Sequence, residues 1–294
     1  MKKTISIRMM EALRRGRKKL GKEAQERLRD YIKSQMIDRA FFMDKSGRED
    51  IYYTAFGLML AYMFGVEVDL ETVNLRLRKY DEKGEEKQDL IHYAAFVRCV
   101  MLAELLGKHE LRMAAKQFFS FGKTIEIPIF ATFPHNDRLT PYSRFVELSL
   151  KEDTGMKMSG KEQIIESLGD YKIQGGGYSN IAGGCSAATN ATVAALFVKG
   201  QLAGYEANED VKSLYDSQTA SGGFLAAEQT PLPDLLSTAT ALFALSSYGV
   251  TPKVHAEPFI EAHWLESGGF SATVMEENSD IEYTFYGILA LGTC

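Results

Sequence analysis

The hydrophobic and polar residues in the second half of the chain repeat with a fixed period. Three glycine pairs, each followed by an aromatic residue, begin at Gly176, Gly222 and Gly268, so that successive pairs are 46 residues apart. Sixteen residues after each of these glycines stands a threonine, and an apolar segment follows it. A period of this size predicts stacked supersecondary units that bury their apolar faces against one another.

Each repeated unit contains three parts. Its apolar segment follows an aspartate in two of the units, Asp234 and Asp280, and an alanine, Ala188, in the other. Because the segment is apolar on nearly all sides and follows a capping position, we expect a buried helix. The glycine pair permits backbone angles that are closed to other residues and predicts a tight turn. The segment before the turn is amphipathic, so each unit is predicted to contain an outer helix, a turn and an inner helix.

The repeat reaches back into the first half of the chain. Asp50–Leu58 matches Asp280–Ile288 in its Asp, Ile, Tyr, Thr and Gly residues. Asp89 begins another copy, and Thr140 begins a further one with Pro141 at its first helical position. Inner helices are therefore predicted near residues 50–64, 89–106, 140–151, 187–200, 234–248 and 280–292, each preceded by an outer helix.

The alternation of six inner and six outer helices predicts an all-α fold, a closed α/α toroid (α6/α6 barrel). An open stack would expose an apolar face at each end, and neither the first nor the last unit has a polar cap. We expect residues 22–294 to form one such domain, preceded by a basic segment over residues 1–21. Closure would gather the inner-helix N-termini at one end of a central cavity, where their N–H groups favour an anionic head group.

Composition narrows the function classes. A formal net charge of −5 argues against a nucleic-acid partner. Three cysteines provide neither a disulfide framework nor a paired metal motif, which favours a reducing compartment, the cytoplasm. No uninterrupted apolar run approaches the ~18 residues of a membrane span. The sequence therefore predicts a cytoplasmic protein without a transmembrane segment.

Residues 1–20 differ from the rest of the chain in charge. They contain eight Lys or Arg residues and one Glu, with apolar residues between them. One interpretation is a solvated amphipathic helix at the surface. The other is a contact with an anionic surface or a protein partner through this segment.

Three glycine-rich motifs give the chain a resemblance to a known superfamily. They are Gln174–Tyr178, Gln218–Phe224 and Trp264–Phe270, each followed by an apolar helix with the repeated threonine. In these motifs the chain resembles the prenyltransferase and squalene-oxidase repeat superfamily, which includes protein prenyltransferase β subunits and class II terpene cyclases. The resemblance is most specific over residues 170–294 and weaker over residues 22–150. It implies an α/α toroid and an isoprenoid-handling activity.

The resemblance can be carried over to individual residues of the zinc site. Where protein prenyltransferases have Asp-x-Cys, this chain has Gly183, Gly184 and Cys185, and where they have a histidine it has Tyr283. Zinc takes about four ligands, so we predict no metal site here and assign no cofactor. Mg²⁺ would enter only together with a diphosphate substrate.

Three residues are candidates for catalysis: Glu282, Asp280 and Cys185. The resemblance to class II cyclases places Glu282 where those enzymes have a protonating aspartate, and a buried carboxylic acid with a raised pKa could donate a proton. A carboxylate in the first helical turn also complements the helix dipole, and Asp280 also serves as an N-cap. Cys185 is either a thiolate nucleophile or a small apolar residue beside glycines.

Several aromatic residues and one histidine near the inner-helix N-termini are candidates for ligand binding. They are Tyr52, Tyr53, His92, Tyr93, Phe96, Tyr142, Tyr283 and Tyr286. These side chains either fill the barrel or line an aromatic pocket suited to an isoprenoid chain or a carbocation. For His92 the alternative is a structural histidine that is hydrogen-bonded to Asp89.

Three functions remain open from the sequence. The first is an isoprenoid-handling enzyme, a divergent prenyltransferase or terpene cyclase-like enzyme that acts on a polyprenyl (diphosphate) substrate in the central cavity. The second is a non-catalytic toroid that binds an isoprenoid or another apolar small molecule. The third is a β-like subunit that needs a helical partner. Turnover of a polyprenyl substrate would favour the first, and bound lipid without turnover would favour the second.

Overall fold

The computed structural model of the chain describes residues 3–82, 89–107, 139–204 and 209–294. These residues are mostly helical, which confirms the all-α prediction. The outer helix expected before residue 140 falls outside the described residues.

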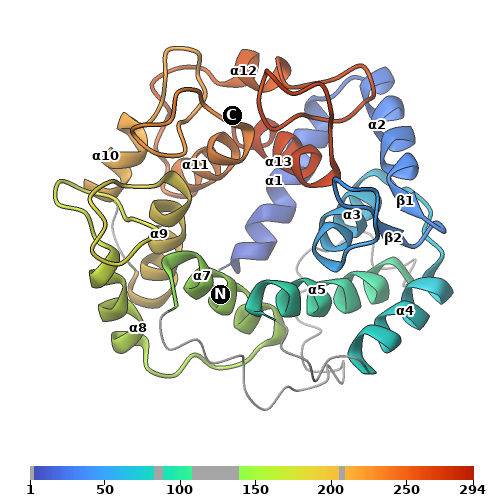
Figure 1. Cartoon of the computed structure of the whole chain (residues 1–294), viewed down its shortest axis with the longest axis horizontal. Coiled ribbons are helices and arrows are strands. Elements are labelled where there is room, and N and C mark those ends of the chain that lie inside the picture. Colours follow the sequence, from blue (N-terminus) through green and yellow to red (C-terminus); the bar gives the residue numbers. More distant parts are fainter. Residues whose placement is uncertain (1–2, 83–88, 108–138, 205–208) are drawn as a thin grey trace.

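The apolar helices predicted as inner helices surround the centre of the molecule (Figure 1). In the described chain they are α3 (Ile51–Phe64), α5 (Leu90–Gly107), α7 (Pro141–Thr154), α9 (Thr189–Ala203), α11 (Leu235–Ser247) and α13 (Ile281–Leu291). Each contacts the next in chain order, and α13 also contacts α3. Both ends of the helix series therefore meet, as the match between the first and last copies predicts.

Five of the six inner helices of the described chain begin after a residue whose side chain caps them, while α9 follows Ala188, which has no capping group. The carboxylates of Asp50, Asp234 and Asp280 accept the N–H of the residue three positions on, at 3.0, 2.7 and 2.8 Å. Asp89 and Thr140 do the same for α5 and α7, at 3.0 and 3.2 Å. The capping role of these residues is confirmed, and each side chain satisfies one N–H that a helix start leaves open.

More polar helices form an outer layer around the inner ones (Figure 1). Those described are α2 (Lys22–Ser34), α4 (Leu70–Glu82), α8 (Lys161–Ser167), which continues into the 3₁₀ helix η3 (Leu168–Tyr171), α10 (Glu209–Asp216) and α12 (Glu257–Glu261). Each packs on the inner helix of its own unit. α12 ends earlier than its pattern predicts, because Trp264 already pairs with Phe270 in the following turn.

The glycine-rich turn of each unit closes with a short antiparallel bridge. Lys172 pairs with Tyr178, Gln218 with Phe224, and Trp264 with Phe270. In the first unit the same spacing pairs Met36 with Phe42, within strands β1 (Met36–Ile37) and β2 (Phe41–Phe42). This two-stranded sheet is therefore the first copy of the turn.

The turn of the first unit lacks the glycine pair of the later copies. In the register of the bridge, Ala40 and Phe41 take the places of the two glycines. The left-handed φ angles, 51° and 54°, fall on Asp38 and Arg39 instead, so the first turn reaches the same bridge by a different backbone path that the glycine pattern does not reveal.

The repeated threonine joins each turn to its inner helix. The hydroxyls of Thr54, Thr192, Thr238 and Thr284 accept the N–H of the aromatic residue that ends the turn, at 3.0, 2.9, 2.9 and 3.2 Å. The same hydroxyls donate to the carbonyl of the capping residue, at 2.6 to 2.8 Å. Because all four threonines are buried, the two bonds replace water for groups that would otherwise be unpaired.

The second glycine of each turn leaves room for the outer helix of the next unit. A Cβ atom on Gly177 or Gly223 would lie 2.5 Å from Ser213 of α10 or Phe259 of α12. On Gly269 it would lie 2.6 Å from Tyr31, which belongs to α2 at the other end of the chain. The last turn therefore packs against the first outer helix in the way that earlier turns pack against their successors.

Residues 5–19 form a further helix, α1 (Ile5–Lys19), that lies across the centre of the molecule (Figure 1). It contacts α3, α7 and α13, and its apolar face is buried, with Ile5 and Leu13 fully enclosed. Arg15 Nε donates to the Gly292 carbonyl at 2.8 Å, and an Arg17 N–H donates to the Met63 carbonyl at 2.7 Å. Cations are favourable at these helix C-termini.

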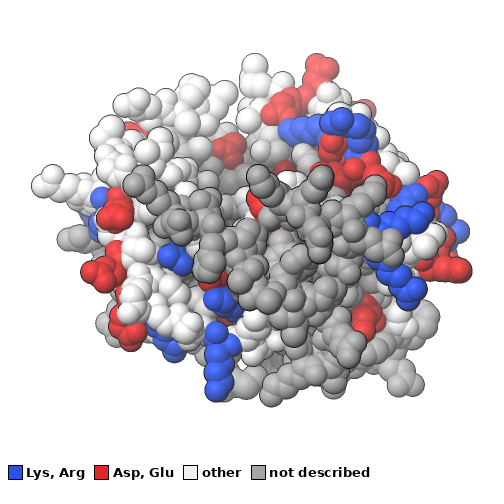
Figure 2. Space-filling model, turned by 60° about the horizontal axis from the view of Figure 1, so that its bottom comes forward, with Lys and Arg blue, Asp and Glu red and all other residues white. Residues whose placement is uncertain are grey.

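The position of α1 changes the interpretation of residues 1–20. Their apolar face is occupied by the inner helices of the same chain, so it does not offer a docking face to an outside partner. Some of their basic side chains, such as Arg15 and Arg17, donate hydrogen bonds to carbonyls at the C-termini of those helices. On the face shown in Figure 2, the described acidic and basic side chains are interspersed.

One described helix, α5, is long and apolar enough to cross a membrane by length and composition. Arg98 and Glu104 interrupt its apolar run, which is why the sequence did not predict it as a span. It contacts α3, α4 and α7, and 61% of it is buried inside the protein. That burial is typical of a core helix.

The threonine that joins turn and helix can be tested by Thr238→Val. The change leaves the buried Phe224 N–H without an acceptor, so we expect the free energy of unfolding to fall by about 1–3 kcal/mol. Thr240→Val on the same helix is the matched control, because its hydroxyl bonds only to carbonyls of its own helix, the nearer being that of Leu236 at 2.9 Å. We expect it to change stability by less than about 0.5 kcal/mol in urea denaturation. Equal losses would contradict this role.

Candidate functional site

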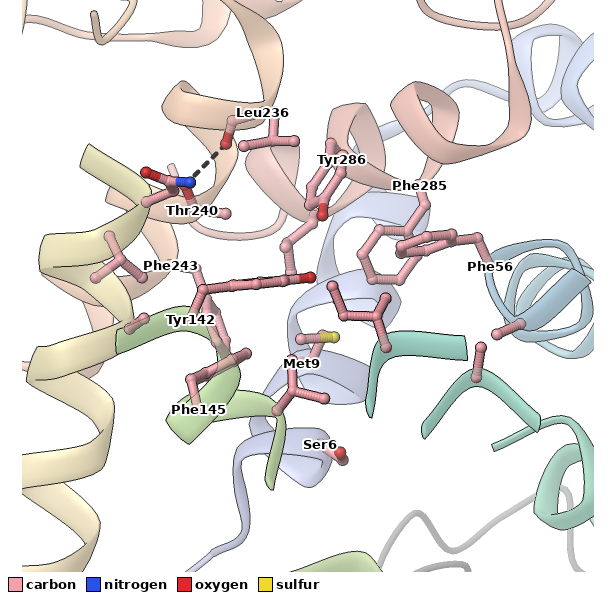
Figure 3. Close-up of a pocket in the computed structure, with 18 of the residues that line it drawn as sticks. Ser6, Met9, Phe56, Tyr142, Phe145, Leu236, Thr240, Phe243, Phe285 and Tyr286 are labelled. Carbon is pink, nitrogen blue, oxygen red and sulfur yellow. Dashed lines mark hydrogen bonds between the residues drawn. The ribbon is translucent and has the colours of Figure 1, made fainter. Parts of the chain in front are cut away.

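A largely apolar cavity of about 330 Å³ lies between the inner helices. All six inner helices of the described chain contribute to its wall, and Ser6 and Met9 of α1 also line it (Figure 3). We call the end with the inner-helix N-termini the capped end and the end with the C-termini the α1 end.

The lining positions repeat from helix to helix. Counted from the capping residue, the second, sixth and ninth positions face the cavity in most of the helices, and the fifth position does so in four of them. In α3 these are Tyr52, Phe56 and Met59, and in α11 they are Leu236, Thr240 and Phe243. Spacings of three and four residues keep these side chains on one helix face. The wall is therefore built from the same face of each repeat.

Aromatic rings make up much of this wall. The ring centroids of Phe56 and Phe285 are 4.9 Å apart, and those of Phe197 and Phe243 are 5.1 Å apart. Phe145 lies 5.8 Å from Phe197 and continues the series (Figure 3). The sequence analysis did not select these phenylalanines. Their negative π faces suit a hydrocarbon chain or a cationic group.

Four predicted site residues come together at the capped end of the cavity: Tyr52, Tyr142, Tyr286 and Glu282. The Tyr52 hydroxyl donates to Glu282 Oε1 at 2.7 Å. Tyr142 and Tyr286 lie close enough to Tyr52 to raise the pKa of its hydroxyl electrostatically, after the larger effect of burial. The three tyrosines line the cavity, and Glu282 lies behind Tyr52 rather than in the lining.

Burial controls the protonation of this group. Desolvation raises the pKa of Glu282, and the nearby Asp280 adds to the effect, while the hydrogen bond from Tyr52 lowers it. Desolvation also raises the pKa values of Tyr52 and Tyr286. The tyrosines therefore stay neutral hydrogen-bonding groups, and Glu282 holds a proton to higher pH than an exposed glutamate.

Asp280, Tyr53 and Tyr283 lie at the capped end outside the cavity lining. The carboxylate of Asp280 caps α13 and lies 3.4 Å from Lys45 Nζ. The Lys45 ammonium lies 5.0 Å from the centre of the Tyr283 ring and also pairs with Glu276 at 3.7 Å. This group joins the first unit to the last. The prediction that Tyr53 and Tyr283 line the cavity is wrong, because the third position after the cap points away from it.

The predicted ligand residues of α5 do not reach the cavity either. His92 is partly exposed, and its Nδ1 lies 2.8 Å from Asp89 Oδ2. This hydrogen bond is the one expected if His92 is a structural histidine. Phe96 stacks on Tyr80 of the outer helix α4, with centroids 5.5 Å apart. Tyr93 is buried outside the lining. Residues three, four and seven positions after the cap face away from the centre.

Cys185 is separate from the other two catalytic candidates. It is exposed, and it lines a polar surface pocket with Gln174, Ser186 and Asp216. It precedes the cap of α9 and therefore belongs to the loop rather than to the inner helix. The structure therefore does not bring Cys185 and Glu282 together in one site.

The capped end is acidic rather than anion-binding. Four of the inner helices begin with an aspartate, and each aspartate occupies N–H groups that an anion would need. Their carboxylates also repel a negative head group. These charges argue against the expectation that this end takes an anionic head group, which stays a prediction.

A second polar group, which the sequence analysis missed, lies toward the α1 end. Arg98 of α5 lines the cavity at the ninth position after Asp89. Its NH2 donates to Ser149 Oγ at 2.9 Å, and its Nε lies 3.9 Å from Asp153 Oδ2. Asp153 also accepts the Ser6 hydroxyl at 2.9 Å, which ties α1 to α7.

Asp153 is strongly affected by its environment. Its side chain is 1% exposed, and burial raises its pKa to about 7, although Arg98 and Ser6 act in the opposite direction. Its Oδ1 atom has no hydrogen-bond partner. The carboxyl is therefore only partly ionised at neutral pH.

Neither a group of metal ligands in the described residues nor a match to a known protein identifies what this cavity binds. Within the described ranges, no three His, Cys, Asp or Glu side chains lie close enough to hold a metal ion. No protein-family model matches the sequence, and no curated protein matches it. The resemblance to the prenyltransferase superfamily therefore stays a prediction from the motifs.

The raised pKa of Asp153 predicts how stability depends on pH. Because the folded-state pKa of Asp153, about 7, exceeds its unfolded value, the folded protein holds this proton more tightly. The contribution of Asp153 to the free energy of unfolding is therefore present at low pH and is lost as the pH rises through 7. Asp153→Asn should remove this loss, so the unfolding free energy of wild type relative to the variant should fall by about 1–3 kcal/mol between pH 5 and 8. Urea denaturation across this range measures it. The exposed Asp30→Asn is the control, and parallel curves for wild type and Asp153→Asn would contradict the prediction.

Proposed function

We propose that the chain is an isoprenoid-handling enzyme that folds as a closed α/α toroid of six helix pairs. The cyclic order of inner-helix contacts and the packing of Gly269 against α2 support the closed form. The apolar, aromatic cavity of about 330 Å³ supports the ligand class, since small-molecule pockets start near about 300 Å³.

The observation that carries the proposal is the half-buried Tyr52–Glu282 pair at the edge of this cavity. An acid with a raised pKa next to an apolar chamber suits protonation of an alkene. The carbocation formed in this way would lie among aromatic rings such as Phe56, Phe285 and Tyr286, whose faces attract positive charge.

The proposed step balances as follows. The π electrons of the alkene form a C–H bond to the Tyr52 hydroxyl proton, and the Tyr52 O–H bond breaks. For this relay the Tyr52 hydroxyl, which donates to Glu282 Oε1 in the resting structure, turns toward the alkene, and a protonated Glu282 passes its proton to the Tyr52 oxygen across the same 2.7 Å separation, which leaves a carboxylate. Loss of a proton from the cyclised cation returns the charge to neutral, and water reprotonates Glu282. No redox partner is needed.

Cyclase-like chemistry is better supported than prenyl transfer from a diphosphate. A diphosphate leaving group needs cations where it departs. At the capped end, Lys45 is already paired with Asp280 and Glu276, and aspartates head the neighbouring helices. A substrate without a diphosphate at that end fits these charges, and Mg²⁺ has no assigned role with such a substrate.

A non-catalytic isoprenoid-binding toroid is the second candidate. It is favoured by one observation, that the Glu282 carboxyl does not itself line the cavity. A β-like subunit with a helical partner has less support, because α1 of the same chain already packs across the inner helices.

Glu282→Gln tests the proposal against this second candidate. Without the acid, conversion of farnesol, geranylgeraniol or squalene should fall at least about 100-fold, with ligand binding retained. Tyr52→Phe should have a similar effect, and Glu276→Gln is the control, since Glu276 pairs with Lys45 outside the cavity. Product analysis by gas chromatography and mass spectrometry gives the rates.

The pH dependence of this activity has a definite sign. Because the protonated form of Glu282 is the donor, activity should decline as pH rises above its raised pKa. Full activity in Glu282→Gln would end the acid hypothesis. Tight binding without turnover in wild type would support the second candidate instead.

A further inference from the structure

Arg98 is the only charged residue among those that line the central cavity in the described chain. It occupies the position that Met59, Phe197 and Phe243 occupy in other repeats. Its side chain retains 27% exposure. A cation at a position that is otherwise apolar is unfavourable unless something compensates its charge.

The protein compensates the charge of Arg98 only in part. A guanidinium has five N–H donors, and Arg98 makes one bond of good length, to Ser149 Oγ at 2.9 Å. Its nearest carboxylate atom, Asp153 Oδ2, lies 3.9 Å from Nε and accepts the Ser6 hydroxyl instead. With a pKa near 7, Asp153 is also partly protonated at neutral pH. Positive charge is therefore left facing the cavity.

The two ends of the cavity differ in charge. Aspartate caps and Glu282 lie at the capped end, while Arg98 lies toward the α1 end with Ser6 and Ser149. A ligand with one anionic end is driven into a single orientation by this difference. Its anion lies at Arg98, and its hydrocarbon chain points toward Tyr52.

We propose that the cavity takes an isoprenoid carboxylate, whose carboxylate pairs with Arg98 and whose distal double bond lies beside the Tyr52–Glu282 pair. This rests on the proposed function, in which the cavity binds an isoprenoid chain. A carboxylate matches the planar guanidinium in shape and matches its single charge. A diphosphate carries more negative charge than one arginine neutralises in an apolar cavity.

The test compares farnesoic acid with farnesol, which have the same hydrocarbon chain and differ in the head group. Isothermal titration calorimetry on the full chain at pH 7.5 should show at least about tenfold tighter binding of the acid. Arg98→Gln should abolish this preference by weakening the acid at least about tenfold, with farnesol within about threefold of wild type. Arg98→Lys should keep part of the preference. Arg144→Gln is the matched control, because Arg144 pairs with Glu147 and does not line the cavity.

The outcomes separate this inference from the proposed function. Equal binding of both ligands to wild type, unchanged in Arg98→Gln, overturns the inference and leaves isoprenoid binding intact. Equal losses for both ligands in Arg98→Gln also overturn it, because they indicate a structural role for Arg98. Absence of binding by either ligand overturns the proposed function and the inference together.

A measurement on wild type alone keeps the proposal testable if Arg98→Gln does not fold. The ¹³C resonance of the carboxyl carbon of bound, labelled farnesoic acid reports its ionisation across pH. Pairing with Arg98 should lower the carboxyl pKa below that of the free acid. A raised pKa, as expected for a carboxyl in a purely apolar cavity, would overturn the proposal.

Discussion

The repeated threonine hydroxyl is the interaction on which the rest of the structure depends. By bonding both the turn and the helix cap, it fixes the distance and angle between each glycine-rich turn and its inner helix. Once the turn is fixed, its second glycine receives the next outer helix, as Gly223 receives Phe259 and Gly269 receives Tyr31. The placement of these turns against the next outer helix is thereby set locally, and the last turn packs on the first outer helix in the same way.

The common orientation of the inner helices has an electrostatic consequence. Their N-termini gather at one end and their C-termini at the other, so their dipoles add across the cavity. The chain complements both ends, with aspartate caps at one and basic residues of α1, such as Arg15 and Arg17, at the other. The aspartate caps that stabilise the helices therefore also repel anions from the capped end of the cavity. Stability and ligand orientation depend on the same side chains.

The sequence predicted the inner helices well, because caps and apolar runs are local signals. It also selected Tyr52 as a ligand-binding candidate and Glu282 as a catalytic one, but the hydrogen bond between them is a finding of the structure. The sequence analysis failed where it selected residues by chemical type instead of by their position after the cap. It selected Phe96, which faces the outer helix, and missed Arg98, two residues later, which faces the cavity.

Other features could not be predicted from local pattern at all. The place of α1 depends on where the inner helices end in space, and no sequence signal connects Arg17 with the Met63 carbonyl. The unpaired oxygen of Asp153 follows from packing between α1, α5 and α7. Likewise, Cys185 lies in the loop before α9, and the path of that loop places it in a surface pocket away from the central cavity.

The repeats make the exceptions informative. At each lining position, most copies carry an apolar side chain that is locally consistent with a buried helix. Arg98 breaks that pattern at a lining position, Glu282 adds an acid behind Tyr52, outside the lining, and Asp153 adds a buried acid beside Arg98. Each costs desolvation free energy that an apolar residue would avoid. Such departures from local consistency are expected at functional sites more than elsewhere. Because Arg98 and Glu282 lie toward opposite ends of one apolar chamber, a single ligand with a polar head and a reactive tail accounts for both.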